Sequence, residues 1–188
     1  KANDIDYSEN PGDGAFYGPK IDFSLKDSLS RVWQLGTIQL DFSMPGRLDA
    51  TYIDKDGNKT TPVMIHRAIL GSLERFVGIL LEHYSGNLPI WLSPIQVMVL
   101  NITDKHSDYA EMITNKLTES GIRSECDLSN EKIGYKIRNH AMTRVPYMLI
   151  IGDKELDEAL VTVRDRESAD QKSIKLDDFI QSLNDKIN

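Results

Sequence analysis

Cysteine, long apolar runs and excess positive charge are all scarce in this sequence. The 188 residues include a single cysteine, Cys126, which excludes an intrachain disulfide and a CxxC metal-binding pair. No apolar run approaches the roughly 18 residues that a membrane-spanning helix needs, and no signal-peptide pattern follows Lys1. Lys and Arg together number 22 against 29 Asp and Glu, so the net charge of −7 argues against generic coating of nucleic acid. These absences predict a protein of a reducing, cytoplasmic compartment with no membrane partner.

The rest of the composition is that of an ordinary globular protein. Hydrophobic residues make up 40% and charged residues 27% of the chain, which argues against a disordered or fibrous structure. The length suits one large domain or two small ones. Residue 1 is Lys rather than Met, and residues 1–16 are polar and rich in Gly and Asp. We therefore expect the chain to be a piece of a longer protein.

Residues 1–91 carry the pattern of antiparallel strands that lead into one helix. Apolar and polar residues alternate from Ile38 to Phe42, which predicts a strand with one polar and one apolar face. From about residue 71 to residue 84, the apolar residues instead recur at the spacing of one face of a helix. The predicted elements are strands at 18–25, 33–43, 50–54 and 63–65, a hairpin turn at 56–58, and a helix over about 71–84.

Residues 92–188 alternate between strands and helices instead. This order predicts a mainly parallel or mixed sheet with helices on its faces. Gly121 follows a predicted helix and suits a left-handed C-terminal cap. The fold class is therefore α+β for a first domain, 1–91, and α/β for a second, 92–188. The predicted strands are 95–100, 122–127, 147–151 and 159–166, and the predicted helices are 106–119, 130–142 and 176–187.

The strand-to-helix junction of the first domain is a candidate anion site. The start of a helix presents unpaired backbone N–H groups, and Arg75 lies one turn beyond it. A guanidinium group there could bind phosphate, or it could simply pair with Glu74 on the surface. His66, on the preceding strand, suits either a hydrogen-bonded core position or a metal ligand.

Polar side chains also follow the predicted strand 33–43. Gln34 and Gln39 would lie on opposite faces of a regular strand, whereas a bulge near Gly36 would bring them to the same face. They then either satisfy backbone groups or line a pocket together with Thr37.

The predicted helix 130–142 and its flanks are the basic island of an acidic chain. Lys132, Lys136 and His140 recur every four residues, and Tyr135 and Asn130 add groups that could stack on bases or bind their edges. The pattern is typical of either a solvated helix face or a surface for single-stranded RNA.

Three long blocks resemble one family. GAFYGPKIDF, WQLGTIQLDFSMPGRL and PVMIHRAILGSLERFVGILLEHY are similar to the end of the catalytic domain of threonyl-tRNA synthetases, which are class II aminoacyl-tRNA ligases. NEKIGYKIRNHAMTRVPYMLIIGDKE, followed by VTVRDR, is similar to the anticodon-binding domain of the same family. The resemblance covers nearly the whole chain.

The resemblance implies roles for the polar residues of 1–91. Arg75 matches the arginine of motif 3, which contacts the phosphate of ATP bound with Mg²⁺, and His66 matches one of three protein ligands of the zinc ion that selects threonine. A site built to engage a hydroxyl group rejects an analogue that lacks it, here valine. The remaining matches line the aminoacyl-adenylate pocket or its zinc-side wall: Gln34, Thr37, Gln39, Tyr17, Lys20 and Ser72. Leu35 stands where bacterial relatives often have cysteine.

In the second domain the resemblance implies recognition of tRNA(Thr). Asn130, Glu155 and Arg164 match positions that read anticodon bases, and Arg138 and Arg144 match basic contacts to the stem-loop. Side chains of these types can hydrogen-bond the base edges of unstacked nucleotides.

Several parts of such a ligase are missing from these 188 residues. The resemblance identifies no motif 1, which forms the homodimer interface, no motif 2, no editing domain, and neither the cysteine nor the second histidine of the zinc site. A single histidine cannot hold zinc tightly. We therefore expect the parent protein to join threonine to tRNA using ATP, and this piece to be inactive alone. The alternatives are a non-catalytic tRNA-binding module or a synthetase-like accessory protein.

Overall fold

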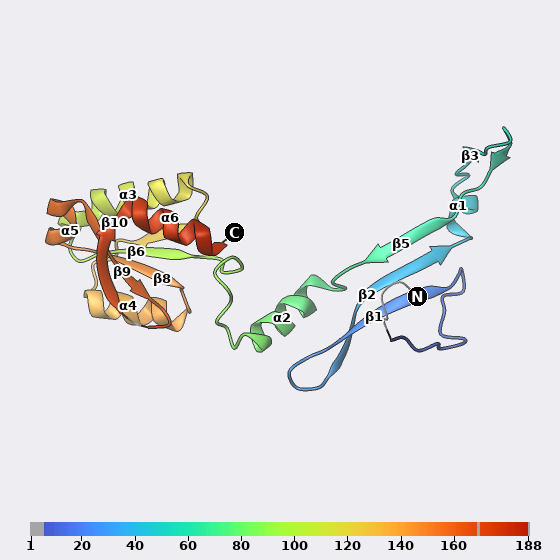
Figure 1. Cartoon of the computed structure of the whole chain (residues 1–188), viewed down its shortest axis with the longest axis horizontal. Coiled ribbons are helices and arrows are strands. Elements are labelled where there is room, and N and C mark those ends of the chain that lie inside the picture. The colour runs from blue at the N-terminus through green and yellow to red at the C-terminus, as the bar shows by residue number, and fades with distance from the viewer. Residues whose placement is uncertain (1–5, 169, 188) are drawn as a thin grey trace. The chain divides into compact units, whose positions relative to one another are not determined.

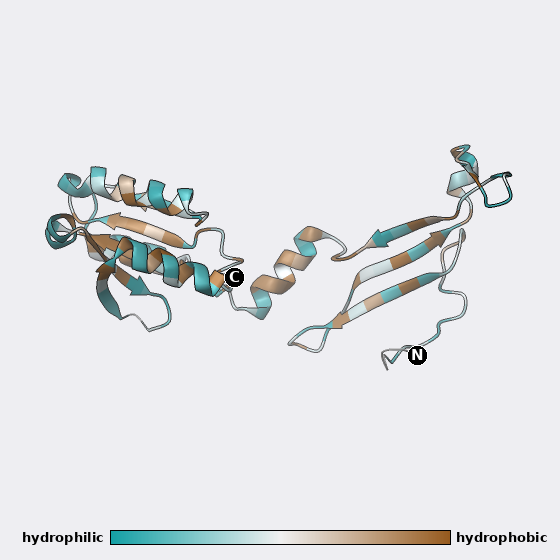
Figure 2. Ribbon diagram, turned by 45° about the horizontal axis from the view of Figure 1, so that its top comes forward, coloured by the Kyte–Doolittle hydropathy of each residue, from teal (hydrophilic) through white to brown (hydrophobic). Residues whose placement is uncertain are grey.

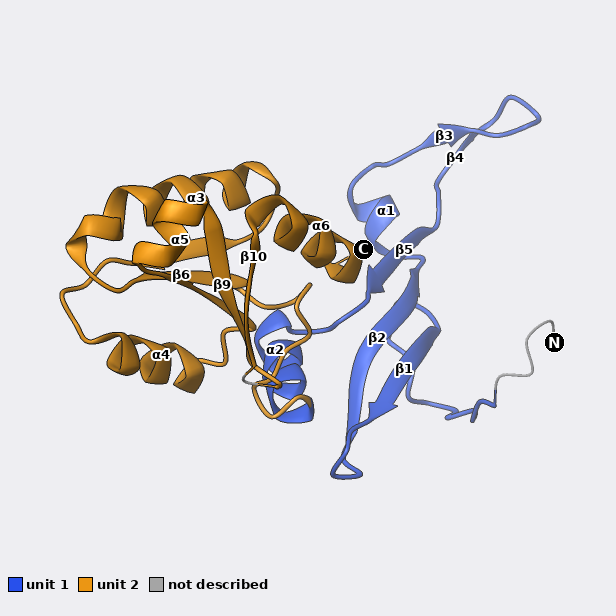
Figure 3. Ribbon diagram, turned by 60° about the vertical axis from the view of Figure 1, so that its left-hand side comes forward, with its two compact units in different colours: residues 1–83 blue, residues 84–188 orange. Residues whose placement is uncertain are grey.

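The computed structural model describes residues 6–168 and 170–187. The chain divides into two compact units, residues 1–83 and 84–188 (Figure 3). This division falls earlier than the predicted boundary at 91/92, because the segment before β6 is bound to the second unit. The guanidinium group of Arg123 donates hydrogen bonds to the carbonyl groups of Ser93 and Trp91, at 2.9 Å and 2.8 Å.

The first unit is built on a three-stranded antiparallel sheet (Figure 1). Its strands lie in the order β1 (Lys20–Lys26), β2 (Val32–Asp41) and β5 (Met64–Ala68). Hydrophilic and hydrophobic residues alternate along them (Figure 2), as the sequence predicts. The apolar side chains of β1 remain exposed, with Ile21 at 60% and Phe23 at 54%.

Three smaller elements and one longer helix complete the first unit. A short helix, α1 (Met44–Arg47), follows β2, and the predicted hairpin pairs β3 (Tyr52–Ile53) with β4 (Lys59–Thr60). The predicted helix is α2 (Leu73–His83), in which the structure buries one residue, Ile79.

The second unit contains a five-stranded mixed sheet in the order β10-β9-β8-β6-β7. Its parallel strands β6, β7 and β8 are joined by helices, and β9 and β10 add antiparallel strands on the β8 side. The parallel order confirms the predicted α/β class. The strands are β6 (Val97–Asn101), β7 (Ser124–Asp127), β8 (Tyr147–Ile151), β9 (Leu160–Asp165) and β10 (Gln171–Lys175).

Helices cover both faces of this sheet, and the core lies between the layers (Figure 1). Val97, Val99 and Leu149 face α3 and α6, whereas Leu100 and Met148 belong to the cluster that packs against α4. Gly121 has a φ of +81° at the end of α3, which confirms the predicted cap. The helices are η1 (Asp104–His106), α3 (Ser107–Glu119), α4 (Ile133–Met142), α5 (Asp153–Glu158) and α6 (Leu176–Ile187).

Candidate functional site

A bulge brings the predicted pocket residues of β2 to one face of the first sheet. The pairing of β1 with β2 shifts by one residue next to Gly36, and Leu35 is left without a partner on β1. Gln34, Thr37 and Gln39 consequently share a face. Of the two arrangements that the sequence left open, a regular strand and a strand with a bulge near Gly36, the structure has the bulge.

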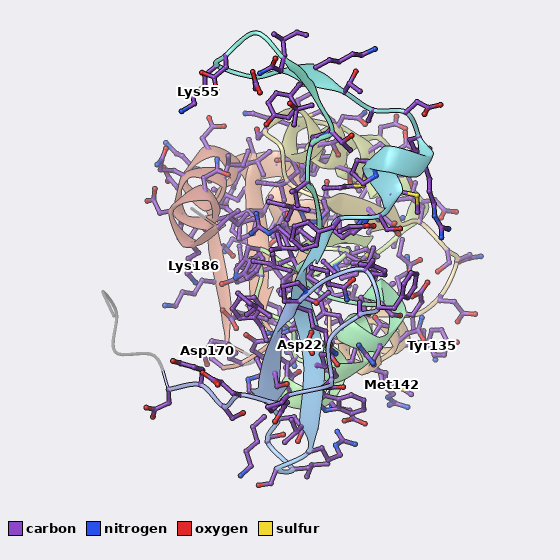
Figure 4. The ribbon with its side chains drawn as sticks, turned by 90° about the vertical axis from the view of Figure 1, so that its right-hand side faces the viewer. Asp22, Lys55, Tyr135, Met142, Asp170 and Lys186 are labelled. Carbon is purple, nitrogen blue, oxygen red and sulfur yellow. The ribbon has the colours of Figure 1, made fainter. Side chains whose placement is uncertain are left out.

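The middle of this face holds a paired charge and an unpaired hydroxyl group. Lys20 Nζ lies 2.9 Å from a carboxylate oxygen of Asp22, a residue labelled in Figure 4. This hydrogen bond holds the pKa of the Asp22 carboxyl below its usual value. The hydroxyl oxygen of Thr37 is buried and makes no hydrogen bond of 3.5 Å or less within the described part of the chain, although it lies close enough to Asp22 to help lower the pKa of that carboxyl. A buried polar atom without a partner indicates space for a polar ligand atom.

Toward the end of β2, the same face presents a network around a buried carboxylate. Tyr17 donates a hydrogen bond of 2.6 Å to Oε1 of Gln39, which lies opposite His66 on β5. His66 Nε2 lies 2.8 Å from Oδ2 of Asp41, which is 2% exposed. The contact with His66, together with the backbone N–H of Met44, lowers the pKa of the Asp41 carboxyl.

Asp41 is a site residue that the sequence analysis did not single out. It lies two residues after Gln39, so the alternation of the strand already assigns it to the polar face. Its burial and its contact with His66 become evident only in the folded sheet.

These residues line a hollow of about 420 Å³. Tyr17, Gln39 and His66 contribute ring and amide groups to the lining, and Asp41 and Arg47 are also part of it. Such a mixture of aromatic, amide and charged groups suits a small polar ligand.

Arg75 lies near the start of β2, beside the backbone of Gln34. Its Nη2 donates a hydrogen bond of 2.8 Å to the carbonyl oxygen of Gln34, and its guanidinium group lies 5.9 Å from the centre of the Trp33 ring. Gly71 permits this approach, because a Cβ there would lie 2.9 Å from Arg75 Nη2 and the φ of +65° favours glycine.

The alternative that Arg75 pairs with Glu74 is not observed among the described residues. Glu74 accepts a hydrogen bond of 2.7 Å from the hydroxyl group of Ser72, and this bond lowers the pKa of the Glu74 carboxyl. Ser72 thus contacts the first turn of α2.

The described residues can supply part of a zinc site. Nε2 of His66 is bound to a carboxylate, as is usual for a metal-ligating histidine, and within the described residues Nδ1 has no hydrogen-bond partner. In residues 6–168 and 170–187, however, no group of three His, Cys, Asp or Glu could hold an ion. His66 can therefore contribute one ligand, and these residues alone do not complete a site.

In the second unit, the prediction that the basic residues of α4 share one exposed face is wrong. Lys136 is 1% exposed and binds Asn101 and Asp127, while His140 Nε2 lies 2.8 Å from Oδ2 of Asp127. Burial would raise the pKa of the Asp127 carboxyl, but hydrogen bonds from Ser129 and His140 outweigh it and lower that pKa.

Other residues of α4 and its flanks do face solvent. Tyr135 is 56% and Met142 75% exposed, both labelled in Figure 4, and Lys132 and Arg138 are exposed beside them. Arg144, also exposed, follows the helix with a φ of +61°. Cationic and aromatic groups thus remain together on this surface.

The three predicted base-reading residues come from different elements. Asn130 is exposed in the loop between β7 and α4, and Glu155 follows β8, so both lie at the carboxyl end of the parallel strands. Glu155 is 8% exposed, and its carboxylate accepts hydrogen bonds from the Gly152 N–H at 3.0 Å and the Thr162 hydroxyl at 2.7 Å. These contacts fix the carboxylate and leave further lone pairs.

Arg164 is half-buried on β9, two residues from Thr162. Because side chains alternate along a strand, Arg164 lies on the same sheet face as Thr162, which binds Glu155. Thr162 is a positioning group that the sequence analysis missed, since an isolated threonine in a strand carries no pattern.

No described helix is long and apolar enough to cross a membrane.

Comparison with protein families matches each unit separately. Residues 3–84 match the family described as tRNA synthetase class II core domain (G, H, P, S and T). Residues 96–186 match the family described as anticodon binding domain.

Three curated relatives are threonine–tRNA ligases. Those of Halorhodospira halophila, Alkalilimnicola ehrlichii and Prochlorococcus marinus are 61%, 60% and 60% identical over 183 residues, which is 97% of this chain. The chain spans only 29%, 28% and 29% of their respective lengths.

Two solved structures are similar over most of the chain. The crystal structure described as the RNA binding domain of threonyl-tRNA synthetase from Cryptosporidium parvum Iowa II has a TM-score of 0.84 and 45% identity, and it covers 97% of this chain and 46% of that chain. The putative threonyl-tRNA synthetase ThrRS-1 from Aeropyrum pernix has a TM-score of 0.60 and 32% identity, and it covers 93% of this chain and 42% of that chain.

Proposed function

We propose a function from the premise that the chain belongs to the threonyl-tRNA synthetase family. In our proposal these residues form part of a threonine–tRNA ligase of the cytoplasm, which is a homodimer when complete. The ligase activates threonine with ATP–Mg²⁺ to give threonyl-adenylate and pyrophosphate, and then transfers the threonyl group to the terminal ribose of tRNA(Thr). Residues 1–83 supply one wall of the adenylation site, and residues 84–188 read the anticodon.

The observation that carries the proposal is the shared polar face of β1, β2 and β5. Gln34 and Thr37 come to this face through the bulge at Leu35, and the buried Thr37 hydroxyl makes no hydrogen bond of 3.5 Å or less to any described residue. We assign the pocket of Gln39 and Tyr17 to the threonyl moiety and Arg75 to ATP phosphate. Activation is then mainly positioning and stabilisation of charge, because a preorganised guanidinium group needs no reorganisation as charge develops on phosphate.

Lys20, Asp41 and Ser72 have supporting roles in this proposal. Lys20 carries positive charge on the pocket face beside Asp22, and Ser72 fixes the first turn of the helix that carries Arg75. Asp41 holds the ring of His66. Zinc, bound by His66 with ligands that the described residues do not contain, would supply a Lewis-acidic contact for the amino and hydroxyl groups of threonine.

Binding of an anticodon stem-loop tests the RNA-reading half of the proposal. We expect the 188-residue polypeptide to bind a stem-loop with a threonine anticodon, more weakly as salt increases, and Arg164→Ala to weaken binding by about tenfold because a base-edge contact is lost. Fluorescence anisotropy with stem-loops of altered anticodon gives both affinity and base preference.

Lys172→Ala is the matched control for Arg164→Ala. Lys172 pairs with Val163 and lines a hollow with Ile174 and Phe179, on the sheet face opposite to Arg164. Its loss should leave base preference unchanged. If Arg164→Ala alters neither affinity nor preference, the assignment of Arg164 is incorrect.

A non-catalytic tRNA-binding module is the second candidate. The apolar core favours it, because 17 of the 19 buried hydrophobic residues among those described belong to residues 84–188. The two candidates differ in whether residues 1–83 act in adenylation when joined to the rest of a ligase.

A further inference from the structure

Lys136 is a fully buried lysine that has no role in the proposed function. Its side chain is 1% exposed, although Arg138 on the same helix and Lys132 just before it face solvent. An ammonium group has three N–H donors, and three acceptors surround this one. They are the carbonyl oxygen of Asn101 at 3.2 Å, Oδ1 of Asn101 at 2.6 Å and the carbonyl oxygen of Asp127 at 2.9 Å.

These acceptors terminate two neighbouring parallel strands. Asn101 ends β6 and Asp127 ends β7, so the ammonium group joins the two strands at their carboxyl ends. In open α/β sheets, ligands bind outside this edge. A buried charge is rarely more stabilising than an apolar side chain of the same volume. A lysine at this place therefore suggests a role beyond filling the core.

A network of polar contacts around Asp127 connects Lys136 with the loop that carries Asn130. The carboxylate of Asp127, 3.9 Å from Lys136 Nζ, accepts hydrogen bonds from the backbone N–H of Ser129 at 3.0 Å and from its hydroxyl group at 2.5 Å. His140 binds the other carboxylate oxygen from α4. Ser129 immediately precedes Asn130, so the contacts that hold Ser129 also restrict the position of the Asn130 backbone.

We propose that Lys136 is a positioning residue for RNA recognition, acting through Asp127 and Ser129 to hold Asn130 in the conformation that contacts an anticodon base. This inference rests on the proposed function. Asn130 is exposed and lies outside the regular elements, so its loop would otherwise lose conformational freedom when RNA binds. A loop fixed in advance avoids that cost and holds the amide at the geometry that a base edge requires.

A double-mutant cycle with Asn130 tests the proposal. Lys136→Met, Asn130→Ala and the double variant of the 188-residue polypeptide are titrated with the threonine anticodon stem-loop, below the unfolding temperature of each. We expect Lys136→Met to weaken binding by about tenfold when Asn130 is present and by less than about twofold when Asn130 is alanine. A purely structural role would give equal factors in both backgrounds, and that result would overturn the proposal.

Two further variants keep the outcomes distinct. Asp127→Ala removes the carboxylate that Ser129 binds, so it serves if Lys136→Met does not fold, and it should show the same coupling to Asn130. Exposed Lys132→Met is the matched control, whose effect should be independent of Asn130 and should reduce the salt dependence of binding. If Asn130→Ala alone leaves affinity and base preference unchanged, the proposed role of Asn130 fails; if only the coupling is absent, the role of Lys136 fails.

Discussion

Arg75→Ala is expected to slow threonine-dependent ATP–pyrophosphate exchange by about a hundredfold to a thousandfold, the usual loss for a preorganised charge-stabilising group. The measurement uses a chimera in which these residues replace the matching part of the Halorhodospira halophila ligase, to which they are 61% identical. Arg75 is held by the Gln34 carbonyl oxygen at 2.8 Å and lies over the ring of Trp33. The loss should appear mainly in kcat, because the contact is strongest when charge develops on phosphate.

Arg31→Ala is the matched control. The guanidinium group of Arg31 lies 5.3 Å from the centre of the same Trp33 ring, but it pairs with Asp27 and Glu82 rather than with the backbone of Gln34. Because both partners of Arg31 lie outside the proposed adenylation pocket, its removal should change exchange by less than about threefold. Equal losses for the two variants would mean that Arg75 only supports Trp33, and unchanged exchange in Arg75→Ala would exclude Arg75 from catalysis.

Backbone amides of β6 and β8 are expected to exchange with solvent at least about a thousandfold more slowly than those of β1 and β5 in the 188-residue polypeptide. β6 is buried at all five residues, whereas the apolar side chains of β1 are largely exposed. Among the described strands, β1 and β5 are also the two edges of their sheet, so each has one row of backbone groups that pairs with no described strand. Hydrogen–deuterium exchange detected by mass spectrometry or NMR measures the difference.

Leu149→Ala provides the internal control for this prediction. Leu149 is 0% exposed in the core beside α3 and α6, and its truncation should cost about 3 kcal/mol of the free energy of unfolding of the second unit. Exchange in β6 should then accelerate strongly while exchange in β2 stays unchanged. Equal protection of the two sheets in the unmutated chain would contradict the assignment of the stable core to residues 84–188.

Periodicity predicted most of the regular elements, because burial on one face constrains residue type. The alternation near Gln39 predicted the first sheet, and the turn at 56–58 predicted the hairpin of β3 and β4. The apolar runs of β6 and β8 predicted the sheet of the second unit. The strand β10 was missed because its QKSIK sequence is mostly exposed at a sheet edge, and α5 was missed because its charged DKELDE sequence is short. Neither element needs an apolar pattern to form.

The sequence predicted which residues belong to the site, but it did not predict which of them contact one another. The sequence left open whether β2 has a bulge near Gly36, and the resemblance assigned roles to Gln34 and His66. The partners of these residues could not be predicted, because Asp41 meets His66 only after β2 pairs with β5. Lys136 illustrates the same limit: its four-residue spacing from His140 predicts a shared helix face, but it does not reveal that both residues turn toward Asp127.

Threonine-dependent ATP–pyrophosphate exchange by the 188-residue polypeptide itself, with zinc added, tests the central claim most directly. The described residues offer one histidine to a metal and one wall to the adenylation pocket, so we predict no exchange above background, in a sample that still binds the anticodon stem-loop. Sustained exchange that His66→Ala abolishes would contradict the account, since it would require a complete catalytic site within these residues.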